Sequence, residues 1–326
     1  MPTRRSLLAA LLAAPLAAGP ARGWAQPAAL AASYPIGFPG RVLGDGFIVR
    51  HGYATENTWY NPGWLHTGED WYALEGDTAG AGVFAIAAGE VVFAGSDYPG
   101  RVVIVRHQPD LFSMYGHLAY DLAVESGQRV LRGAHLGTVL AITEGRAPSH
   151  LHFEVRTFLT IPEVNGDAPR YGVGCGFQCP PGPGYWPIGA PEHPSALGWR
   201  NPTHAIATFT AEGQSSPVEA AAVVAAGSSG DVEVWSAPVD RDGAETTGTL
   251  SLVPGERFIL TDVETGDPAG NGASAESYRL WYRIALPTGV EGWVEAVRPS
   301  VEETGGDGRP SAIRFNFLPP TPTEGQ

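Results

Sequence analysis

Short hydrophobic runs separated by glycine- and proline-containing turns follow one another through the middle of the chain. Such runs, rich in β-branched and aromatic residues and bounded by turn residues, are typical of strands. The connections between them are too short for crossover helices, so we predict an antiparallel sheet in an all-β protein. The predicted strand regions are 83–95 (VFAIAAGEVVFAG), 100–107 (GRVVIVRH), 111–120 (LFSMYGHLAY), 127–140 (GQRVLRGAHLGTVL) and 150–158 (HLHFEVRTF).

A second group of strand-like runs follows a change of composition near residue 211. The stretch EGQSSPVEAAAVVAAGSSG indicates a linker, and four later runs, DVEVWSAP, GERFILTDVE, YRLWYRIAL and GVEGWVEAV, are enough for a small barrel. The last residues are expected to extend or fray. The predicted organisation is a signal peptide at 1–25, a large domain at 26–210, a linker at 211–229, a second domain at 230–299 and a tail at 300–326.

The beginning of the chain has the pattern of an export signal. MPTRRSLLAALLAAPLAAGPARGWAQ combines a charged start, a short apolar centre and small residues at Gly23 and Ala25. TRRSLL resembles the twin-arginine type, although paired arginines also occur in ordinary secretory signals. No other apolar run approaches the roughly 20 residues of a spanning helix. We therefore expect an exported protein of the periplasm, the cell envelope or the extracellular space, without a transmembrane span.

The net charge and the two cysteines limit the ligands and the kinds of site that we expect. With 34 acidic against 20 basic residues, the net charge of −14 argues against binding to nucleic acid or to anionic lipid. Both cysteines, Cys175 and Cys179, lie in a Gly/Pro-rich loop. In an oxidising compartment a local disulfide is favoured over free thiols, and two thiols alone make a poor zinc site.

The stretch Ser149–Arg156, SHLHFEVR, places two histidines two positions apart in a predicted strand. Because side chains alternate across a strand, His150, His152, Glu154 and Arg156 share one face, while the apolar residues between them fill a core. The polar face is expected to be open. It is either a solvated face that happens to contain histidine, or a metal ligand beside a catalytic base.

His66 and Asp70 in LHTGEDWYA form a second candidate pair. Gly68 and the preceding NPGW favour a turn that enters a strand over a helix. A neutral imidazole and a carboxylate are both good zinc ligands, although this spacing alone is weak evidence. Glu69, between them, is expected to be solvated.

The third piece is His117 in MYGHLAY, on a predicted strand with Tyr115 on the same face. A lone histidine there is more often structural than catalytic, so its weight depends on the other motifs. The chain has no HExxH, which excludes a thermolysin-like helix, and its HxH is a poor match to a cupin.

Taken together, HTGED, YGHL and SHLHFEVR, in this order and separated by AIAAGEVVFAG and GQRVLRGAHLGTV, resemble the lysostaphin-type (LytM-like) zinc endopeptidases of peptidoglycan. The resemblance runs from about Trp64 to Arg156 and resumes at Asn201-Pro202, which is similar to the closing strand motif of the family. It implies an antiparallel β-sheet groove domain, one Zn²⁺ per chain, and peptidoglycan stem peptides or cross-links as substrate. The implied zinc ligands are His66, Asp70 and His152, and the implied catalytic residues are His117 and His150.

Under this resemblance, the water that attacks the peptide would be oriented or deprotonated by His150, beside the ligand His152. Tyr60, six residues before His66, is a candidate oxyanion donor, although a tyrosine in a turn more often packs. The remaining histidines are expected to be structural: His51, His107, His135, His193 and His204.

The chain departs from the family pattern in a long insertion at about 158–200. This Gly-, Pro- and aromatic-rich stretch is either an ordered surface loop or the wall of a groove, so it bears on which peptide fits.

The runs GDVEVWSAP, PGERF, WYRIAL and GVEGWV resemble a bacterial SH3-like domain over about Gly230–Arg298. This resemblance implies a wall or peptide ligand. The alternative is that the aromatic residues fill a small barrel. The aromatic candidates for the ligand contact are Trp235, Trp281, Tyr282 and Trp293.

The sequence thus predicts an exported zinc-dependent peptidoglycan endopeptidase with an SH3-like accessory domain. Two alternatives remain: a wall-binding or hydrolase-activating protein that keeps the fold without the chemistry, and an exported binding module built on β scaffolds. All five residues of the family's site pattern are present, which favours the enzyme.

Overall fold

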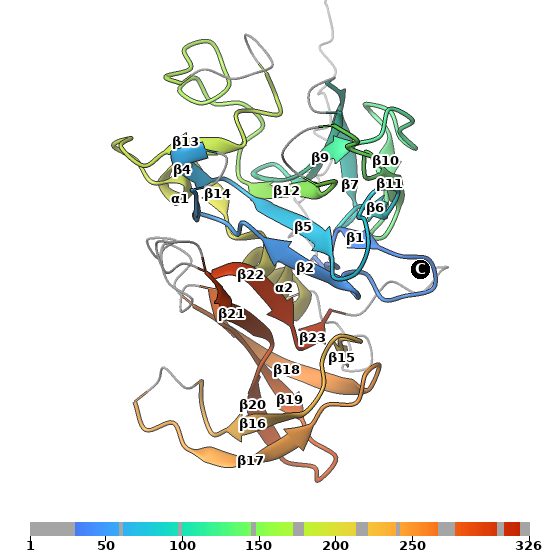
Figure 1. The fold of residues 1–326 in the computed structure, drawn as a ribbon, viewed down its shortest axis with the longest axis vertical. Helices are drawn as coiled ribbons and strands as arrows, with labels where there is room; N and C mark the ends of the chain where they lie inside the picture. The colour runs from blue at the N-terminus through green and yellow to red at the C-terminus, as the bar shows by residue number, and fades with distance from the viewer. Residues whose placement is uncertain are drawn as a thin grey trace, which may run out of the picture.

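The computed structural model describes residues 30–58, 61–96, 100–144, 148–171, 179–212, 221–238, 242–266, 278–304 and 310–319. Within these residues, two helices accompany four sheets whose paired strands are all antiparallel (Figure 1). The predicted all-β, antiparallel fold class is therefore confirmed. None of the helices in the described segments is long and apolar enough to cross a membrane.

The largest sheet has ten strands and carries the predicted motifs. Its neighbouring strands come partly from consecutive segments and partly from segments far apart in the chain. The strand order along the sheet is β10 (Arg129–Val130), β7 (Gly89–Gly95), β8 (Arg101–Gln108), β9 (Leu111–Leu118), β12 (Leu151–Arg156), β5 (Glu69–Ala73), β2 (Phe47–Arg50), β22 (Pro310–Phe315) and β21 (Val297–Thr304), with β14 (Trp199–Arg200) pairing with β12.

Two three-stranded sheets flank the large one. The first has the order β1 (Ile36–Gly37), β6 (Gly82–Phe84) and β11 (His135–Thr138), and the second has the order β13 (Tyr185–Pro187), β4 (Asn61–His66) and β3 (Glu56–Asn57). The second sheet is notable because β13 belongs to the predicted insertion. The insertion is thus paired with the strand that ends in His66.

The C-terminal part of the chain forms a seven-stranded sheet. Its order is β17 (Thr246–Ser251), β16 (Asp231–Trp235), β20 (Glu291–Glu295), β19 (Leu280–Ala285), β18 (Arg257–Thr265), β15 (Ala221–Val224) and β23 (Phe317–Leu318). Alternation places Tyr282, Ile284 and Val294 in the core, each 0% exposed. The sheet agrees with the predicted set of strands, and its description as an SH3-like barrel remains a prediction.

The two sheets are joined by shared elements as well as by a connecting segment. Strand β22, from near the C-terminus, pairs with β2 in the large sheet, next to β5 (Figure 1). The helix α2 (Pro202–Glu212) packs against both β12 and β18. Phe315 stacks on Trp71 with ring centroids 5.1 Å apart, in a hydrophobic core that continues from one region into the other.

Several local expectations are changed by these elements. The segment 211–229 contains the strand β15, and the segment 300–326 contains β22 and β23, so neither is entirely linker or tail. These strands are stabilised by pairing with distant parts of the chain, which no local pattern reveals.

The Asn201-Pro202 motif begins α2, because Asn201 Oδ1 accepts from the backbone N–H of His204 and proline suits a first helical turn. The strand at this place is β14, just before it. The other helix, α1 (Pro194–Leu197), lies in the insertion.

Candidate functional site

Strand β12 carries the histidine pair in the centre of the large sheet, between β5 and β9. The predicted alternation holds, since Leu151 and Phe153 belong to the main core while His150 and His152 face away from it. The expectation of an open polar face was wrong. His150 and His152 are each 7% exposed, and Glu154 and Arg156 are fully buried, because the insertion covers this face.

His66 and Asp70 approach His152 from a tight connection between β4 and β5. His66 ends β4 and Asp70 is the second residue of β5, so the predicted turn entering a strand is confirmed. The turn passes directly over β12: a Cβ atom added to Gly68 would lie 2.4 Å from the carbonyl oxygen of Phe153. Only glycine allows this close approach, which brings the ends of both strands to His152.

Three ligand-type atoms converge there. His66 Nε2 lies 2.9 Å from His152 Nδ1, and Asp70 Oδ1 lies 3.3 Å from the former and 3.2 Å from the latter. All three side chains are buried. Two imidazole nitrogens and a carboxylate oxygen in one triangle form a group that could hold a divalent metal ion.

Backbone contacts fix the orientation of His66. Its Nδ1 lies 2.8 Å from the carbonyl oxygen of His51, so Nδ1–H donates there and Nε2 is left free to bind a metal ion. The side chain of His51 also approaches Asp70, with Nδ1 3.7 Å from Oδ2. The sequence predicts only a structural role for His51, because nothing in its local pattern shows that its carbonyl contacts His66.

Glu154 fixes the orientation of His152, as the His51 carbonyl fixes that of His66. Burial by itself raises the pKa of Glu154, but contacts with His152, Arg156 and Thr67 outweigh burial and hold its pKa below the usual value. Its Oε1 lies 3.2 Å from His152 Nε2, so the imidazole donates to the carboxylate and Nδ1 faces His66. Trp199 Nε1 donates to the other oxygen. The sequence placed Glu154 on the histidine face without assigning it a role.

The histidines and carboxylates of the cluster shift one another's pKa values toward the charged forms. Burial raises the pKa of Asp70, but the neighbouring His66 and His150 and the hydrogen bond from His152 reverse this effect and leave the pKa well below its ordinary value. For His152, burial lowers the pKa, whereas the hydrogen bonds to Asp70 and Glu154 raise it to about 9. The carboxylates are therefore ionised acceptors at neutral pH, as metal binding and imidazole orientation both require.

His150 lies beside this triangle with a defined tautomer. Its Nδ1 is 2.8 Å from the carbonyl oxygen of Pro148, so Nδ1–H donates and the lone pair is on Nε2, which lies 3.7 Å from Asp70 Oδ1. Its ring stacks on Tyr72 at 4.9 Å. Burial lowers the pKa of His150, with Asp70 acting in the opposite direction. A neutral imidazole with a free Nε2 can accept a proton.

His117 reaches the cluster through an unusual backbone. Its ring centroid lies 4.5 Å from that of His150 and 6.0 Å from that of His152. Tyr115 is in the main core against Phe153, so the prediction that Tyr115 and His117 share a face was wrong. His117 has φ +59°, which breaks the alternation after Gly116 and turns the imidazole toward β12. Non-glycine residues in this region are uncommon and concentrate at functional sites.

The structure also overturns the expectation that Glu69 is solvated. Glu69 is 0% exposed, and its Oε1 accepts from Thr203 Oγ1 at 2.7 Å and from Tyr278 Oη at 3.0 Å. Trp71 Nε1 donates to Oε2. Burial raises the pKa of Glu69 to about 7, although these hydrogen bonds oppose the shift. Strand β5 is covered on both faces, so the residue beside Asp70 points into the junction with the C-terminal region.

The insertion forms one wall of the site. Tyr185 on β13 pairs with His66, with ring centroids 5.0 Å apart, and the carbonyl oxygen of Gly184 accepts from the backbone N–H of Thr67. The buried Arg156 donates to the carbonyl oxygens of Pro180 and Pro181. Of the two alternatives for the insertion, a groove wall is therefore the better description of its described residues. Nothing in the sequence pattern singled out Tyr185.

Two predicted residues lie outside the described part of the chain: Tyr60 and Cys175. Cys179 is buried and disulfide-bonded. The pairing of Cys175 with Cys179 remains a prediction. Among the histidines expected to be structural, His107 bridges Ala88 and Ser113, and His204 is buried on α2, both away from the metal-type triangle.

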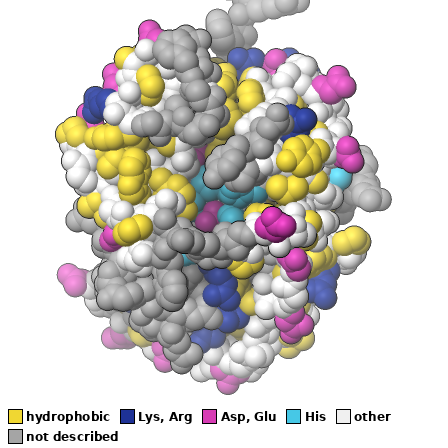
Figure 2. Space-filling view, turned by 45° about the horizontal axis from the view of Figure 1, so that its top comes forward, with side chains coloured by type: hydrophobic (Ala, Val, Ile, Leu, Met, Phe, Trp, Pro, Cys, Tyr) yellow, Lys and Arg dark blue, Asp and Glu magenta, His cyan; other side chains and the backbone are white. Residues whose placement is uncertain are grey.

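Figure 2 shows histidine side chains gathered in a hollow at the centre of one face, next to acidic side chains and between hydrophobic ones. Buried carboxylates orient the imidazoles, and the hollow gives access from outside. Such a set of imidazole and carboxylate groups, with both a metal-type triangle and a free imidazole nitrogen, is typical of a metal-dependent hydrolase.

Residues 65–167 match the model of Peptidase family M23. This segment contains all five clustered residues, and the chain thus carries a peptidase M23 domain. The match covers about a third of the chain, and no curated protein matches the sequence.

Parts of several solved structures are also similar to this chain. A protein of Pseudomonas aeruginosa assigned to peptidase M23 is 28% identical, over 40% of this chain and 47% of that chain, with a TM-score of 0.28. A zinc-containing peptidase of Vibrio cholerae is 27% identical, over 38% and 36%, with a TM-score of 0.29. The antimicrobial peptidase lysostaphin of Staphylococcus simulans is 14% identical, over 84% and 94%, with a TM-score of 0.33. This chain therefore spans less than half of the first two proteins.

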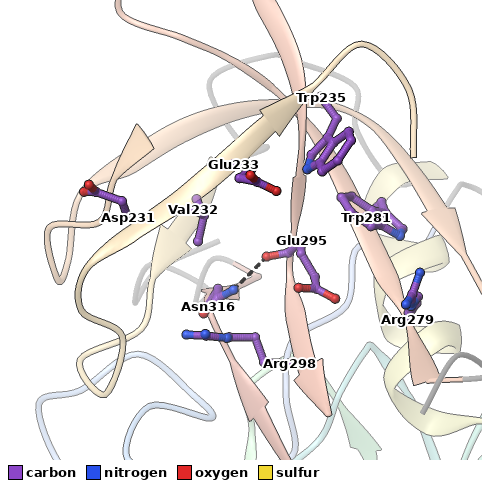
Figure 3. A pocket seen from close by; sticks show the side chains of 9 residues that line it. All are labelled: Asp231, Val232, Glu233, Trp235, Arg279, Trp281, Glu295, Arg298 and Asn316. Carbon is purple, nitrogen blue, oxygen red and sulfur yellow. Dashed lines mark hydrogen bonds between the residues drawn. The ribbon is translucent and has the colours of Figure 1, made fainter. Parts of the chain in front are cut away.

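A second concave feature lies on the C-terminal sheet. A cavity of 280 Å³ is lined by Trp235 and Trp281, by the acidic residues Asp231, Glu233 and Glu295, and by Val232, Arg279, Arg298 and Asn316. In Figure 3 the arginines lie at the opposite side from Trp235, with the carboxylate of Glu295 between them. Burial raises the pKa of Glu295, while both arginines oppose the shift. Of the predicted aromatic contacts, Tyr282 is fully buried and fills the core.

Proposed function

We propose that the protein is an exported zinc-dependent endopeptidase that hydrolyses peptide cross-links of bacterial peptidoglycan. The observation that carries this proposal is the buried triangle of His66, Asp70 and His152 with the free Nε2 of His150 beside it. The D-alanyl to diaminopimelate bond is the substrate that we propose first, because the resemblance is to peptidases of wall peptides. Export rests on the pattern of residues 1–25.

The donor atoms fit a zinc ion. With zinc–ligand bonds of about 2.0–2.1 Å, two ligands of a tetrahedral site lie about 3.3 Å apart. The three separations in the triangle, 2.9, 3.2 and 3.3 Å, are close to that value. The ligand types also agree, and each imidazole donates its other N–H to an oxygen, as zinc-binding histidines usually do. A fourth position would remain for water.

A zinc ion held by these residues would act as a Lewis acid toward the scissile carbonyl and lower the pKa of the attacking water to about 7. Protein side chains would then accept and donate the protons that the reaction transfers. His150 Nε2 accepts the proton of the attacking water, while Nδ1–H stays bonded to Pro148. His117, on the other side of His150, donates to the carbonyl oxygen as negative charge develops or passes a proton to the leaving amine nitrogen.

Hydrolysis of purified peptidoglycan tests the proposal. Zinc-loaded protein should release cross-linked stem peptides as uncross-linked products, which mass spectrometry of the digested wall identifies together with the bond that was cut. The alternative, a non-catalytic wall-binding or hydrolase-activating protein, predicts that the zinc-loaded protein leaves every cross-link intact. Trimming the insertion in a parallel variant separates a covered site from an inactive one.

We further propose that the C-terminal sheet is an SH3-like domain whose cavity binds a wall peptide. Two indole faces and the carboxylate of Glu233 attract an ammonium group, and Arg279 and Arg298 at the other side attract a carboxylate. A peptide that carries both groups matches this arrangement. The proposed domain limits remain those predicted from the sequence, with the strands β15 and β23 added to the C-terminal unit and β22 added to the large sheet.

Calorimetric titration of an Asp70→Ala protein with a soluble stem peptide measures this binding without hydrolysis. Trp235→Ala in that background should weaken binding about tenfold, since aromatic anchors dominate such contacts. Val290→Ala, at an exposed apolar residue outside the cavity, is the matched control. Equal affinities for the two variants would mean that the tryptophans only complete the barrel.

A further inference from the structure

One tyrosine of the C-terminal region contacts residues that lie directly behind the candidate metal centre. Tyr278 is 1% exposed and lies just before β19, more than two hundred residues after the motif His66–Asp70. Its hydroxyl accepts from the backbone N–H of Tyr53 and donates to Glu69 Oε1 at 3.0 Å. The hydroxyl of Tyr278 thus accepts one hydrogen bond and donates another, both to residues of the N-terminal domain.

The first contact bears on His66. Residues 51–54 form a turn in which His51 and Ala54 have φ of +51° and +54°, an unfavourable conformation for non-glycine residues. The ring of Tyr278 closes over Gly52, where an added Cβ would lie 2.7 Å from it. The same turn presents the His51 carbonyl to His66 Nδ1 at 2.8 Å, and Ala54 N–H donates to the His66 carbonyl. Tyr278 therefore packs on the backbone that sets the tautomer of His66.

The second contact bears on Asp70. Glu69 precedes it on β5 and is held by Tyr278 together with Thr203 from the start of α2. The backbone N–H of Asp70 donates to the His51 carbonyl, so the turn and the strand meet at the same oxygen. The hydroxyl of Tyr278 thus joins the supports of two of the three ligand-type residues.

We propose that Tyr278 is a positioning residue of the metal centre, so that the C-terminal region helps to build the site as well as to bind the wall. This inference rests on the proposed metal-binding function. It predicts that the loss of one hydroxyl in the C-terminal region changes metal affinity and the geometry of the bound ion, because metal sites depend on the hydrogen bonds behind their ligands.

The chain offers a matched pair of variants. Tyr278→Phe removes the hydroxyl that reaches Tyr53 and Glu69. Tyr282→Phe removes a hydroxyl that is also buried in the C-terminal region but has no partner among the described residues. The full-length proteins are loaded with Zn²⁺ for affinity measurement by chelator competition, and with Co²⁺ for absorption spectra. Unfolding of each apoprotein in denaturant reports any general loss of stability.

Tyr278→Phe should weaken zinc binding about 10- to 100-fold and shift the cobalt ligand-field bands, whereas Tyr282→Phe should leave both as in the wild type. Equal affinity and identical cobalt spectra in Tyr278→Phe and wild type would overturn the inference, even if Tyr278→Phe is less stable. A wild-type protein that binds neither ion would instead overturn the proposed metal site, so the two failures are distinct.

Discussion

The two concave regions of the molecule hold their polar groups in different ways. Around the histidine cluster, each imidazole that belongs to the triangle has a carbonyl or carboxylate partner, and the buried Glu154 accepts from four side chains. In the C-terminal cavity, the described residues give Arg279 and Arg298 no ion pair within 4 Å. The first region fixes its groups before any ligand arrives, and the second leaves charges to be paired by one.

This difference is the one expected between a catalytic centre and a binding surface. A catalytic centre needs side chains held within small tolerances, which buried hydrogen bonds provide. A binding surface instead gains from charges and aromatic faces that a ligand completes. Variants that remove a partner should therefore have large effects in the first region, and the changes below test this comparison in order of decreasing effect.

The largest effect is expected for Asp70→Ala. Asp70 supplies the only carboxylate of the metal-type triangle, so its loss should leave less than about a tenth of the zinc after dialysis, while the β-sheet circular dichroism stays largely intact. Elemental analysis of the purified protein measures the metal content. Asp110→Ala, at an exposed turn between β8 and β9, is the control. Full zinc retention in the Asp70 variant would remove the assigned ligand set.

Next comes His150→Ala, which separates the base from the ligands. His150 is outside the triangle, so the variant should keep its zinc yet lose on the order of 10²- to 10⁴-fold in the rate of cross-link hydrolysis. His135→Ala, at an exposed histidine, should leave the rate unchanged. Loss of zinc in His150→Ala would show that the roles of His150 and His152 are exchanged.

Glu154→Gln tests the partners behind the ligands. The amide keeps the volume but removes the charge that accepts from His152 Nε2, so zinc affinity should fall about 10- to 100-fold in a chelator competition. Glu90→Gln, which alters a surface ion pair with Arg106, is expected to have no effect. Unchanged affinity in the Glu154 variant would contradict the view that the first region is fixed by its buried network.

The smallest effect on the candidate site is expected at His204, which affects acid stability at the junction. Burial lowers the pKa of His204 on α2 to about 4, against about 6.5 in an unfolded chain. As pH falls from about 6.5 to 4, the unfolded chain binds a proton at this residue and the folded protein does not, so stability decreases by up to about 3 kcal/mol.

The free energy of unfolding at pH 7.5 and 4.5 measures this contribution. His204→Leu should lose less stability on acidification than the wild type, whereas His135→Leu should behave like the wild type. The same loss in His204→Leu as in the wild type would show that His204 titrates normally in the folded protein.

The parts of this molecule that the sequence predicts are those set by local pattern. Short hydrophobic runs bounded by turn residues define β8, β9 and β12, and the residue types and order of the motifs place His66, His117 and His152 in one site. The residues that support the site could not be predicted from the sequence. The His51 carbonyl, Tyr185 and Tyr278 act through contacts between distant segments, and ordinary residue types at these positions carry no local signal.

The left-handed conformation of His117 and the insertion of β22 beside β2 are tertiary effects of the same kind. Alternation assigns His117 to the wrong face because it assumes a regular strand. Likewise, a Pro-, Gly- and Thr-rich end of the chain has a composition typical of a tail, and pairing with β2 and β21 makes part of it a strand.

X-ray absorption of the zinc-loaded wild-type protein tests the central claim most directly. We predict one zinc per chain with four nitrogen or oxygen neighbours at about 2.0–2.1 Å, two of them imidazoles, from His66 and His152 with Asp70 and a solvent molecule. A sulfur neighbour at about 2.3 Å, a third imidazole, or a chain that cannot be loaded with zinc would contradict it.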